Sequence, residues 1–171
     1  MGRDAWRRGQ LGSLVLLLIA TLLILRPWEA GGGVNDGPAA ADAFVVRVID
    51  GDTIEARIDG ALEDVRYIGV DTPETVKPDT PVQCFGPRAS AFNHRLVEHR
   101  RVHLVFGVER HDIYGRLLAY VYLGRRFVNA TLARRGLART LTIPPNDRFA
   151  PLFARLQLRA ARVGRGLWGK C

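Results

Sequence analysis

Carboxylates and an arginine gather in two short runs of the sequence. The first run is VIDGDTI at residues 48–54, and the second is RYIGVDTPET at residues 66–75. In these runs Asp52 and Asp71 can supply oxygen ligands, which suit a hard cation such as Ca²⁺. Hydrolysis of a phosphodiester needs such a cation, positive side chains for the phosphate oxygens and a group that orients water. The two runs therefore predict a calcium-assisted phosphodiesterase site.

Simpler explanations exist for these acidic residues. Asp50-Gly51-Asp52 by itself is typical of a turn. An EF-hand loop is excluded because the required acidic spacing and the final Glu are absent. A zinc site is not indicated either, since the two cysteines are far apart and the four histidines lack ligand spacing. The metal interpretation depends on Asp71-Thr72-Pro73-Glu74, which follows a second strand, and on Arg116, which follows a Tyr-Gly pair.

A hairpin is expected to bring the two runs together. The first run continues with alternating apolar and polar residues as far as Asp59-Gly60, a strong signal for a two-residue turn. A tight turn sets Thr53 opposite Arg66, so the start of one strand lies beside the end of the next. The same register places Glu55 opposite Asp64, and these like charges could let the strands slip. In either register the acidic residues of the two runs converge.

The remaining pattern predicts one domain of short strands and helices. Besides the two strands of the hairpin, strands are expected at residues 44–50, 102–105 and 117–123. Helices are expected to open at Gly86-Pro87, to cover residues 128–135, and to run from residue 149 to Trp168. Five strands with interspersed helices, one core and no repeats indicate a mainly β fold, a small closed barrel with three helices against it.

The N-terminal part of the chain carries a targeting pattern. The first eight residues hold three arginines, and residues 11–25 are almost wholly apolar. This order predicts an apolar helix over residues 1–28, which is a signal peptide or a transmembrane anchor. The arginines keep the N-terminus cytoplasmic, so the rest is exported to the extracytoplasmic side. We favour an uncleaved anchor in the cell membrane over a cleaved, secreted form. Residues 29–42 are then a flexible linker, and residues 43–171 are the folded domain.

Two cysteines, Cys84 and Cys171, lie in the exported part. An even number of cysteines in an oxidising compartment predicts one disulfide. The bond would close a loop of about 90 residues, fix the C-terminus and stabilise the fold by ~4 kcal/mol on the chain-entropy model. Two free thiols are the alternative.

The chain is strongly basic. Its formal net charge is +8, and residues 31–171 hold 21 basic and 15 acidic residues, so the folded part stays positive. A positive surface concentrates polyanions such as nucleic acid or anionic lipid. Genomic bias is the plainer explanation, because all but two of the 25 basic residues are arginine.

Six runs of the sequence resemble one known family. They are VIDGDTI, RYIGVDTPET, CFGPRASAF, DIYGRLLAYVYL, VNATLARRGLA and GLWGKC, and they follow the order of the staphylococcal nuclease (thermonuclease) family. The resemblance covers residues 44–171. It implies a five-stranded OB-fold-type β-barrel with three α-helices. It also implies Ca²⁺-dependent cleavage of DNA and RNA at the 5′ P–O bond, leaving 3′-phosphates. We also expect a monomer.

The resemblance implies roles for the acidic run. Asp52 and Asp71 match the calcium carboxylates of the family, and Thr72 matches a ligand that uses its main-chain carbonyl. Glu74 matches the residue that positions or deprotonates the attacking water. Asp50 matches an acidic residue that lies beside the metal and is not a firm ligand.

The resemblance also implies how the phosphate is held, and here the chain departs from the family. Arg66 and Arg116 match two arginines on the reacting phosphate, and Tyr114 matches a tyrosine that hydrogen-bonds a terminal phosphate. The family prototype has a lysine where this chain has Ile113. Its two base-flanking tyrosines fall in the loop at residues 140–143, which has no aromatic residue here. Base affinity or preference should therefore differ, while the catalytic set is retained.

Two other classes of function remain open from the sequence. A non-catalytic nucleic-acid-binding barrel would use the same fold, but relatives of that kind lose acidic or arginine members of the site, and this chain keeps them. A structural membrane protein with a basic, lipid-facing surface would explain the charge but not the clustered carboxylates.

Overall fold

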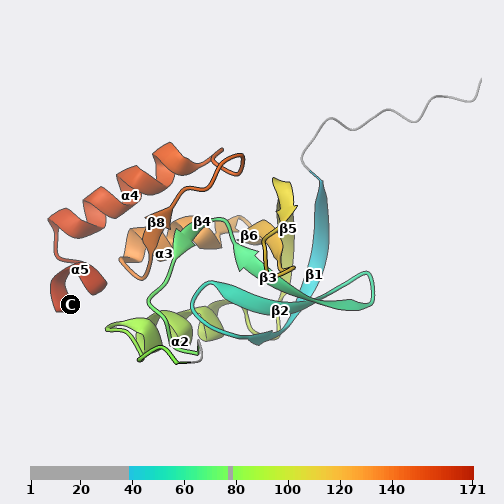
Figure 1. The fold of residues 1–171 in the computed structure, drawn as a ribbon, viewed down its shortest axis with the longest axis horizontal. Coiled ribbons are helices and arrows are strands. Elements are labelled where there is room, and N and C mark those ends of the chain that lie inside the picture. The colour runs from blue at the N-terminus through green and yellow to red at the C-terminus, as the bar shows by residue number, and fades with distance from the viewer. Residues whose placement is uncertain (1–38, 77–78) are drawn as a thin grey trace, which may run out of the picture. The chain divides into compact units, whose positions relative to one another are not determined.

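The computed structural model describes residues 39–76 and 79–171. The expected apolar helix over residues 1–28 lies outside the described residues, and so does most of the expected linker over residues 29–42. Within the described ranges no helix has the length and hydropathy needed to cross a membrane. The described chain forms a β-barrel with helices packed against it (Figure 1).

The secondary-structure elements are labelled in Figure 1. The strands of the described chain are β1 (Ala40–Val48), β2 (Thr53–Ile58), β3 (Ala61–Tyr67), β4 (Gly69–Asp71), β5 (Arg101–His111), β6 (Leu117–Leu123), β7 (Arg126–Phe127) and β8 (Arg139–Leu141). The helices are α2 (Gly86–Val97), α3 (Val128–Arg135), α4 (Ala150–Arg162) and the short α5 (Leu167–Lys170).

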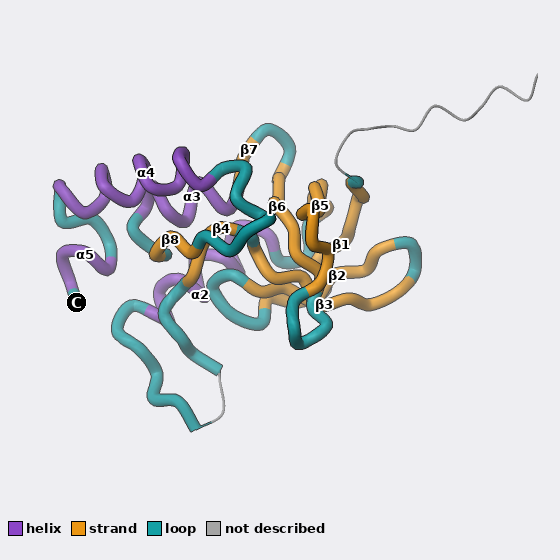
Figure 2. The backbone as a smooth tube through the Cα atoms, turned by 45° about the horizontal axis from the view of Figure 1, so that its top comes forward, coloured by secondary structure: helices purple, strands orange, loops and turns teal. Residues whose placement is uncertain are grey.

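Five of these strands close into the barrel. β1 pairs with β2 and β5, β2 pairs with β3, and β5 pairs with β6, all in antiparallel fashion. A short parallel pairing between β3 and β6 joins the two ends of the sheet. β4 and β8 form a separate two-stranded ribbon. α2 and α3 pack against the barrel, and α3 and α4 pack against the ribbon (Figures 1 and 2). The prediction of a five-stranded barrel with three helices is confirmed, and α5 is an additional single turn.

The hairpin between β2 and β3 has the tight register that the sequence predicts. Asp59 and Gly60 adopt positive φ angles of 48° and 91°, as a two-residue hairpin turn requires. Thr53 consequently lies opposite Arg66. The end of β3 is thereby fixed beside the loop that precedes β2.

A neighbouring arginine offsets the like charges in this hairpin. Glu55 and Asp64 do lie opposite each other. Arg47 on β1 lies opposite Glu55 on its other side, and its Nη2 and Nε donate to the two carboxylate oxygens at 3.0 and 3.2 Å. These hydrogen bonds lower the pKa of Glu55. The expected conflict is present, and Arg47 supplies the charge that counters it.

Two strands are longer than the sequence pattern indicates. β1 begins at Ala40, before the expected start at Phe44, because its first residues pair with β5. β5 continues to His111, beyond the expected end at Val105, and pairs with β6 past an irregularity that follows Phe106. The pairing partners of both extensions are distant in sequence, so local periodicity does not report them.

The last helix is shorter than predicted. α4 ends at Arg162, whereas the apolar spacing suggested one helix as far as Trp168. Gly164 and Gly166 adopt positive φ angles of 58° and 64°, which end the helix. A Cβ at Gly166 would overlap the carbonyl oxygen of Gly136, so the chain passes too close to the end of α3 for a larger residue.

The helices also position β4, the strand of the separate ribbon that carries Asp71. α4 buries Phe153, whose ring lies where a Cβ on Gly69 would be. Gly69 begins β4, and Asp71 ends it. α3 contributes the buried Asn129, whose side-chain amide donates to the carbonyl of Ile68 at 2.9 Å. Packing from one helix and a hydrogen bond from another therefore set the path of β4.

Cys84 and Cys171 form a disulfide between residues 87 positions apart in sequence. Cys84 lies just before α2, and Cys171 follows α5. The bond fixes the C-terminal segment to the start of α2. A loop of this length corresponds to ~4.6 kcal/mol on the chain-entropy model.

Candidate active site

The loop between β1 and β2 is shaped by its own acidic residue and by a contact with the second run. A carboxylate oxygen of Asp50 accepts the backbone N–H of Asp52 at 2.9 Å. A Cβ on Gly51 would lie 2.6 Å from the Oγ1 atom of Thr72, so only glycine leaves room for that side chain. Two segments that are separate in sequence therefore meet at this loop.

Asp52 is the most deeply buried acidic residue of the site. It is 3% exposed. Its Oδ2 accepts both the backbone N–H and the hydroxyl of Thr72. Its Oδ1 lies 2.9 Å from Nη1 of Arg66 and accepts the hydroxyl of Thr53 at 3.3 Å. Both oxygens of this carboxylate are thus held in place by contacts with neighbouring residues.

Ionisation of Asp52 nevertheless costs free energy in the folded protein. Burial raises the pKa of Asp52 to about 7, and the nearby Asp50 adds to the rise, although Arg66 and the hydrogen bonds from Thr72 act in the opposite direction. A cation placed beside such a buried carboxylate stabilises its ionised form. This is the electrostatic property expected of a metal ligand.

Replacing Asp52 with asparagine should stabilise the metal-free protein at alkaline pH. The ordinary pKa of an aspartate is 3.8, whereas the pKa of Asp52 in the folded protein is about 7. The folded state therefore holds the proton more tightly than the unfolded state does. As the pH rises from the lower pKa to the higher one, ionisation of Asp52 destabilises the folded state increasingly, and above the higher pKa this loss of stability is constant. Asparagine keeps an acceptor for Thr72 and has no charge. Thermal unfolding in chelator should show an advantage of the variant at about pH 8 and little at about pH 4. An equal shift at both values would contradict this explanation.

Arg66 links the two carboxylates that the sequence assigned to the metal. Its Nη1 contacts Asp52, and its Nη2 donates to Oδ1 of Asp71 at 2.8 Å. Nη1 also donates to the carbonyls of Val70 and Tyr67 at 2.8 and 3.2 Å. The side chain of Arg66 is only 12% exposed. The structure thus brings Asp52 and Asp71 to a single positive group.

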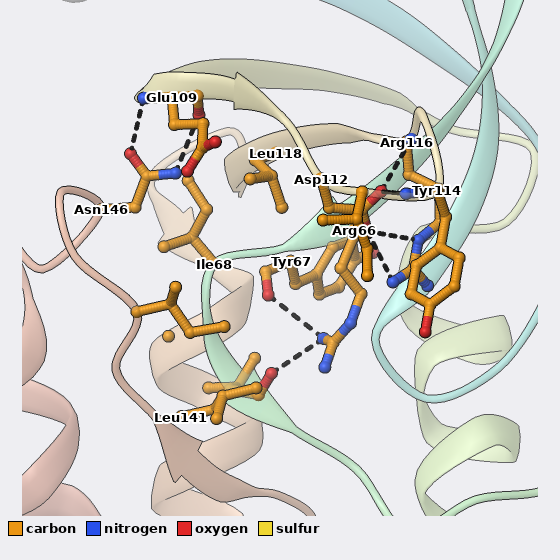
Figure 3. Close-up of a pocket in the computed structure, with 14 residues that line it drawn as sticks. Arg66, Tyr67, Ile68, Glu109, Asp112, Tyr114, Arg116, Leu118, Leu141 and Asn146 are labelled. Carbon is orange, nitrogen blue, oxygen red and sulfur yellow. Dashed lines mark hydrogen bonds and ion pairs between the residues drawn. The ribbon is translucent and has the colours of Figure 1, made fainter.

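Arg116 is held by an acidic residue that the sequence analysis did not single out. Oδ2 of Asp112 accepts Nε of Arg116 at 2.7 Å, and Nη2 lies at 2.7 Å from the same oxygen. Oδ1 of Asp112 accepts the backbone N–H groups of Tyr114 and Arg116 (Figure 3). Partial burial acts to raise the pKa of Asp112, but these hydrogen bonds outweigh it and the pKa is lowered. Asp112 could have been identified from sequence because it begins a four-residue turn that ends at Gly115, a position that aspartate favours.

Glu74 is fixed by the loop that follows it and by Gln83. Oε1 of Glu74 accepts the backbone N–H groups of Thr75 and Val76 at 2.8 and 2.9 Å. The backbone N–H of Glu74 donates to the side chain of Gln83 at 3.0 Å, and the N–H of Gln83 donates back to the carbonyl of Glu74 at 2.9 Å. Gln83, which sequence reasoning also missed, joins the two ends of this loop.

One cavity collects all of the residues that the sequence analysis placed in the metal and phosphate site. It has a volume of about 530 Å³. Its lining includes Asp50, Asp52, Arg66, Asp71, Thr72, Glu74, Tyr114 and Arg116. The disulfide between Cys84 and Cys171 is not part of this lining. With Asp64, which also lines it, the cavity combines five carboxylates with two guanidinium groups, an arrangement suited to a cation and a phosphate together.

The comparison with known families agrees with this geometry. A family model described as staphylococcal nuclease homologue matches residues 64–170. The chain belongs to the staphylococcal nuclease family. It is 42% identical to a thermonuclease of Staphylococcus intermedius over 159 residues, which are 91% of this chain and 95% of the relative. It is 39% identical to a thermonuclease of Staphylococcus hyicus over 162 residues, 90% of this chain and 95% of the relative. It is also 42% identical to the endonuclease YncB of Bacillus subtilis over 126 residues, 72% of this chain and 60% of the relative.

In this member of the staphylococcal nuclease family a second cavity adjoins the first. Its volume is about 370 Å³, and Arg66, Tyr114 and Arg116 line both cavities. Figure 3 shows this second cavity. Its other walls include Leu141, which ends β8, and Ile143 from the loop that follows, the segment where the resemblance places base-flanking tyrosines. Ile113, in place of the prototype's lysine, is 92% exposed at the edge. The departures seen in the sequence thus make part of this cavity aliphatic.

The oxygen donors of this staphylococcal nuclease site fit a hard cation. Asp52 and Asp71 already share a positive group, and burial disfavours the ionised form of Asp52, which raises its pKa, so further positive charge beside it would be favourable. The described residues that line the cavity include no histidine or cysteine, so zinc is not favoured. Among the residues that the structure describes, no three acidic, histidine or cysteine side chains surround one point. A backbone carbonyl and waters would therefore complete the coordination.

Proposed function

We propose that this chain is a Ca²⁺-dependent nuclease that hydrolyses phosphodiester bonds of DNA and RNA at the 5′ P–O bond and leaves 3′-phosphates. Membership of the staphylococcal nuclease family, with relatives named thermonuclease and endonuclease, makes the chain a hydrolase of the nuclease type. The observation that carries the finer proposal is one cavity in which two carboxylates share Arg66 beside Arg116 and Glu74.

Asp52, Asp71 and the carbonyl of Thr72 are proposed to hold the cation. When bound, Ca²⁺ supplies positive charge to an oxygen of the substrate phosphate. The contribution of the protein is to align the carboxylates. Thr72 does this for Asp52 through two hydrogen bonds, which also offset part of the rise that burial causes in its pKa.

The two arginines are proposed to bind the reacting phosphate. A guanidinium group can donate two parallel hydrogen bonds to phosphate oxygens. Nε and Nη2 of Arg116 both contact Oδ2 of Asp112. These contacts fix the plane of the guanidinium group and leave Nη1 to bind the substrate. Arg66 would exchange Asp71 for a phosphate oxygen, because its Nη2 contacts the more exposed of its two carboxylate partners.

Glu74 and Tyr114 complete the proposed machinery. The carboxylate of Glu74 is positioned by two backbone amides and lines the same cavity, so it can orient a water molecule or take its proton. Tyr114 is mostly exposed, with its ring centre 5.4 Å from the guanidinium carbon of Arg116. Its hydroxyl is suited to hydrogen-bond a terminal phosphate.

The purified protein should release acid-soluble nucleotides from denatured DNA and from RNA when Ca²⁺ is present. A chelator should abolish the release, and fresh Ca²⁺ should restore it. Mass analysis of the fragments should show phosphate on the 3′ ends. Cleavage that persists in chelator would contradict the calcium dependence, and 5′-phosphate ends would contradict the assignment of the bond.

A non-catalytic nucleic-acid-binding barrel is the alternative. It predicts binding of DNA or RNA in saturating Ca²⁺ without cleavage. The complete set of carboxylates and arginines in one cavity favours the enzyme.

We also propose that the domain works on the extracytoplasmic side of the membrane, either anchored there or secreted. The disulfide between Cys84 and Cys171 supports this, because such bonds persist in oxidising compartments. The N-terminal residue of the mature protein distinguishes the two forms, since an uncleaved anchor begins at the start of the chain.

A further inference from the structure

A groove beside α2, which we call the α2 groove, is lined by arginines from three parts of the fold. Arg88 and Arg95 come from α2, Arg135 ends α3, and Arg165 lies in the turn before α5. The groove has a volume of about 470 Å³, and the described residues that line it include no acidic side chain. Within the described part of the chain, none of the four arginines forms an ion pair. The α2 groove is therefore a concentrated positive surface.

Two phenylalanine rings lie beneath these arginines. The guanidinium carbon of Arg88 is 5.2 Å from the ring centre of Phe85, and that of Arg135 is 4.9 Å from the ring centre of Phe92. Both rings are half-buried. Arginines that bind phosphates, and flat aromatic or guanidinium planes on which bases stack, are the two components of a surface for single-stranded nucleic acid, and each arginine–phenylalanine pair can supply both.

The α2 groove begins where the loop of Glu74 ends. Phe85 immediately precedes α2 and has a φ angle of 71°, a left-handed conformation that is unfavourable for a bulky residue. A Cβ on Gly86 would lie 2.8 Å from the carbonyl oxygen of Glu74 and 2.9 Å from that of Pro73. This close packing joins the end of the groove to the catalytic loop. The helices that carry or adjoin the groove, α2, α3 and α5, lie in the left half of Figure 1.

We propose that the α2 groove binds the part of a single-stranded nucleic acid that extends beyond the cleaved phosphodiester on the side of Glu74. This inference rests on the proposed nuclease function, and it adds a second contact region for long substrates. Charge complementarity selects a polyanion. The half-buried position of Phe85 and Phe92 favours flat bases over a lipid bilayer, because insertion into a membrane uses apolar side chains that protrude.

A triple variant, R88Q/R95Q/R135Q, tests the groove. In chelator, its affinity for a fluorescent oligodeoxythymidine of about 30 nucleotides should fall at least tenfold. The slope of log affinity against log salt should become shallower by ~0.7 for each phosphate that the variant no longer neutralises. In Ca²⁺, KM for the same oligonucleotide should rise, while kcat/KM for a single-nucleotide p-nitrophenyl phosphodiester stays within about twofold.

A second triple variant, R57Q/R101Q/R125Q, provides the matched control. These arginines are exposed and line neither the α2 groove nor the catalytic cavity, and their replacement removes the same charge. The control variant should change the salt slope much less. Equal effects of the two triple variants would overturn the proposal, because net charge alone would then explain the binding. F92L should weaken oligonucleotide binding by roughly tenfold with the salt slope unchanged, as expected for a stacked base. An unchanged affinity of F92L would remove the stacking role.

Two further results separate this inference from its competitors. If the groove variant loses binding to phosphatidylserine vesicles but keeps oligonucleotide affinity, the groove is a lipid contact and the proposal fails. If the wild-type protein does not cleave the small phosphodiester in Ca²⁺, the proposed function fails. The oligonucleotide measurements in chelator would still decide whether the groove binds single strands.

Discussion

Replacing Arg66 with glutamine should lower kcat by at least ~10²–10³-fold, the usual loss for one donor to a transition state. Arg66 lines both cavities of the site and carries two Nη atoms that contact carboxylates in this structure. Glutamine has neither the charge nor the forked geometry of these donors. Kinetics on a phosphodiester substrate in saturating Ca²⁺ measure the effect. A rate close to that of the wild-type protein would remove Arg66 from the reaction.

The same substitution should destabilise the calcium-free protein at about pH 8, because Asp52 is buried and loses its direct counter-charge. Removal of one partner from a buried pair costs ~3–5 kcal/mol when the other remains charged. Ca²⁺ should recover much of this stability, since the cation replaces the guanidinium beside Asp52, but it should not recover the rate. Urea unfolding with and without Ca²⁺ separates the two effects. An equal loss of stability in both conditions would contradict the shared role of the two cations.

Two other arginines serve as references for Arg66. Arg57 is exposed on β2 and lines neither cavity, so Arg57→Gln should leave both rate and stability nearly unchanged. Arg116→Gln should lower the rate like the substitution at Arg66, with a smaller effect on stability. Asp112 keeps the two backbone N–H groups that bind its Oδ1 when the side chain of Arg116 is replaced.

Local sequence was sufficient to predict half of this site. The turn at Asp59-Gly60 sets the register of one hairpin, and that register places Arg66 at the level of Thr53, next to Asp52. Turn type, strand alternation and short sequence separation all act within this one segment. The convergence of Asp52 and Arg66 therefore follows without knowledge of the rest of the fold.

The other half depends on contacts that local patterns do not report. Arg116 reaches the cavity because β3 pairs in parallel with β6, which sets Arg66 opposite Leu118. The Tyr-Gly pair before Arg116 marked it as a candidate, but local patterns gave no reason for it to lie beside Arg66; only the resemblance to the family implied that position. Asp112 and Gln83 were missed because they act on other residues: one binds a guanidinium, and the other binds a backbone N–H and carbonyl. Residues of this kind have no motif of their own, so the geometry of their partners is needed to recognise them.

Glu74→Gln should lower kcat by ~10²–10⁴-fold, the range expected when a general base or water-orienting carboxylate is lost. The amide oxygen of glutamine can still accept the N–H groups of Thr75 and Val76, which now bind Oε1 of Glu74. The loop should therefore keep its shape, and the loss should report the missing charge. Kinetics in saturating Ca²⁺, with circular dichroism to verify the fold, measure it. A near-normal rate would assign the activation of water to another group.

Gln83 offers a way to separate the position of Glu74 from its charge. Gln83→Met has a similar length but no acceptor for the N–H of Glu74, whereas Gln83→Glu keeps one. The methionine variant should lose roughly tenfold in kcat with KM unchanged, because the carboxylate is less firmly positioned, and the glutamate variant should retain more of the rate. Equal losses in the two variants would mean that the hydrogen bond does not position the loop. Since both variants keep Glu74 itself, a difference between them measures the contribution of geometry, and the Glu74→Gln result measures the contribution of charge.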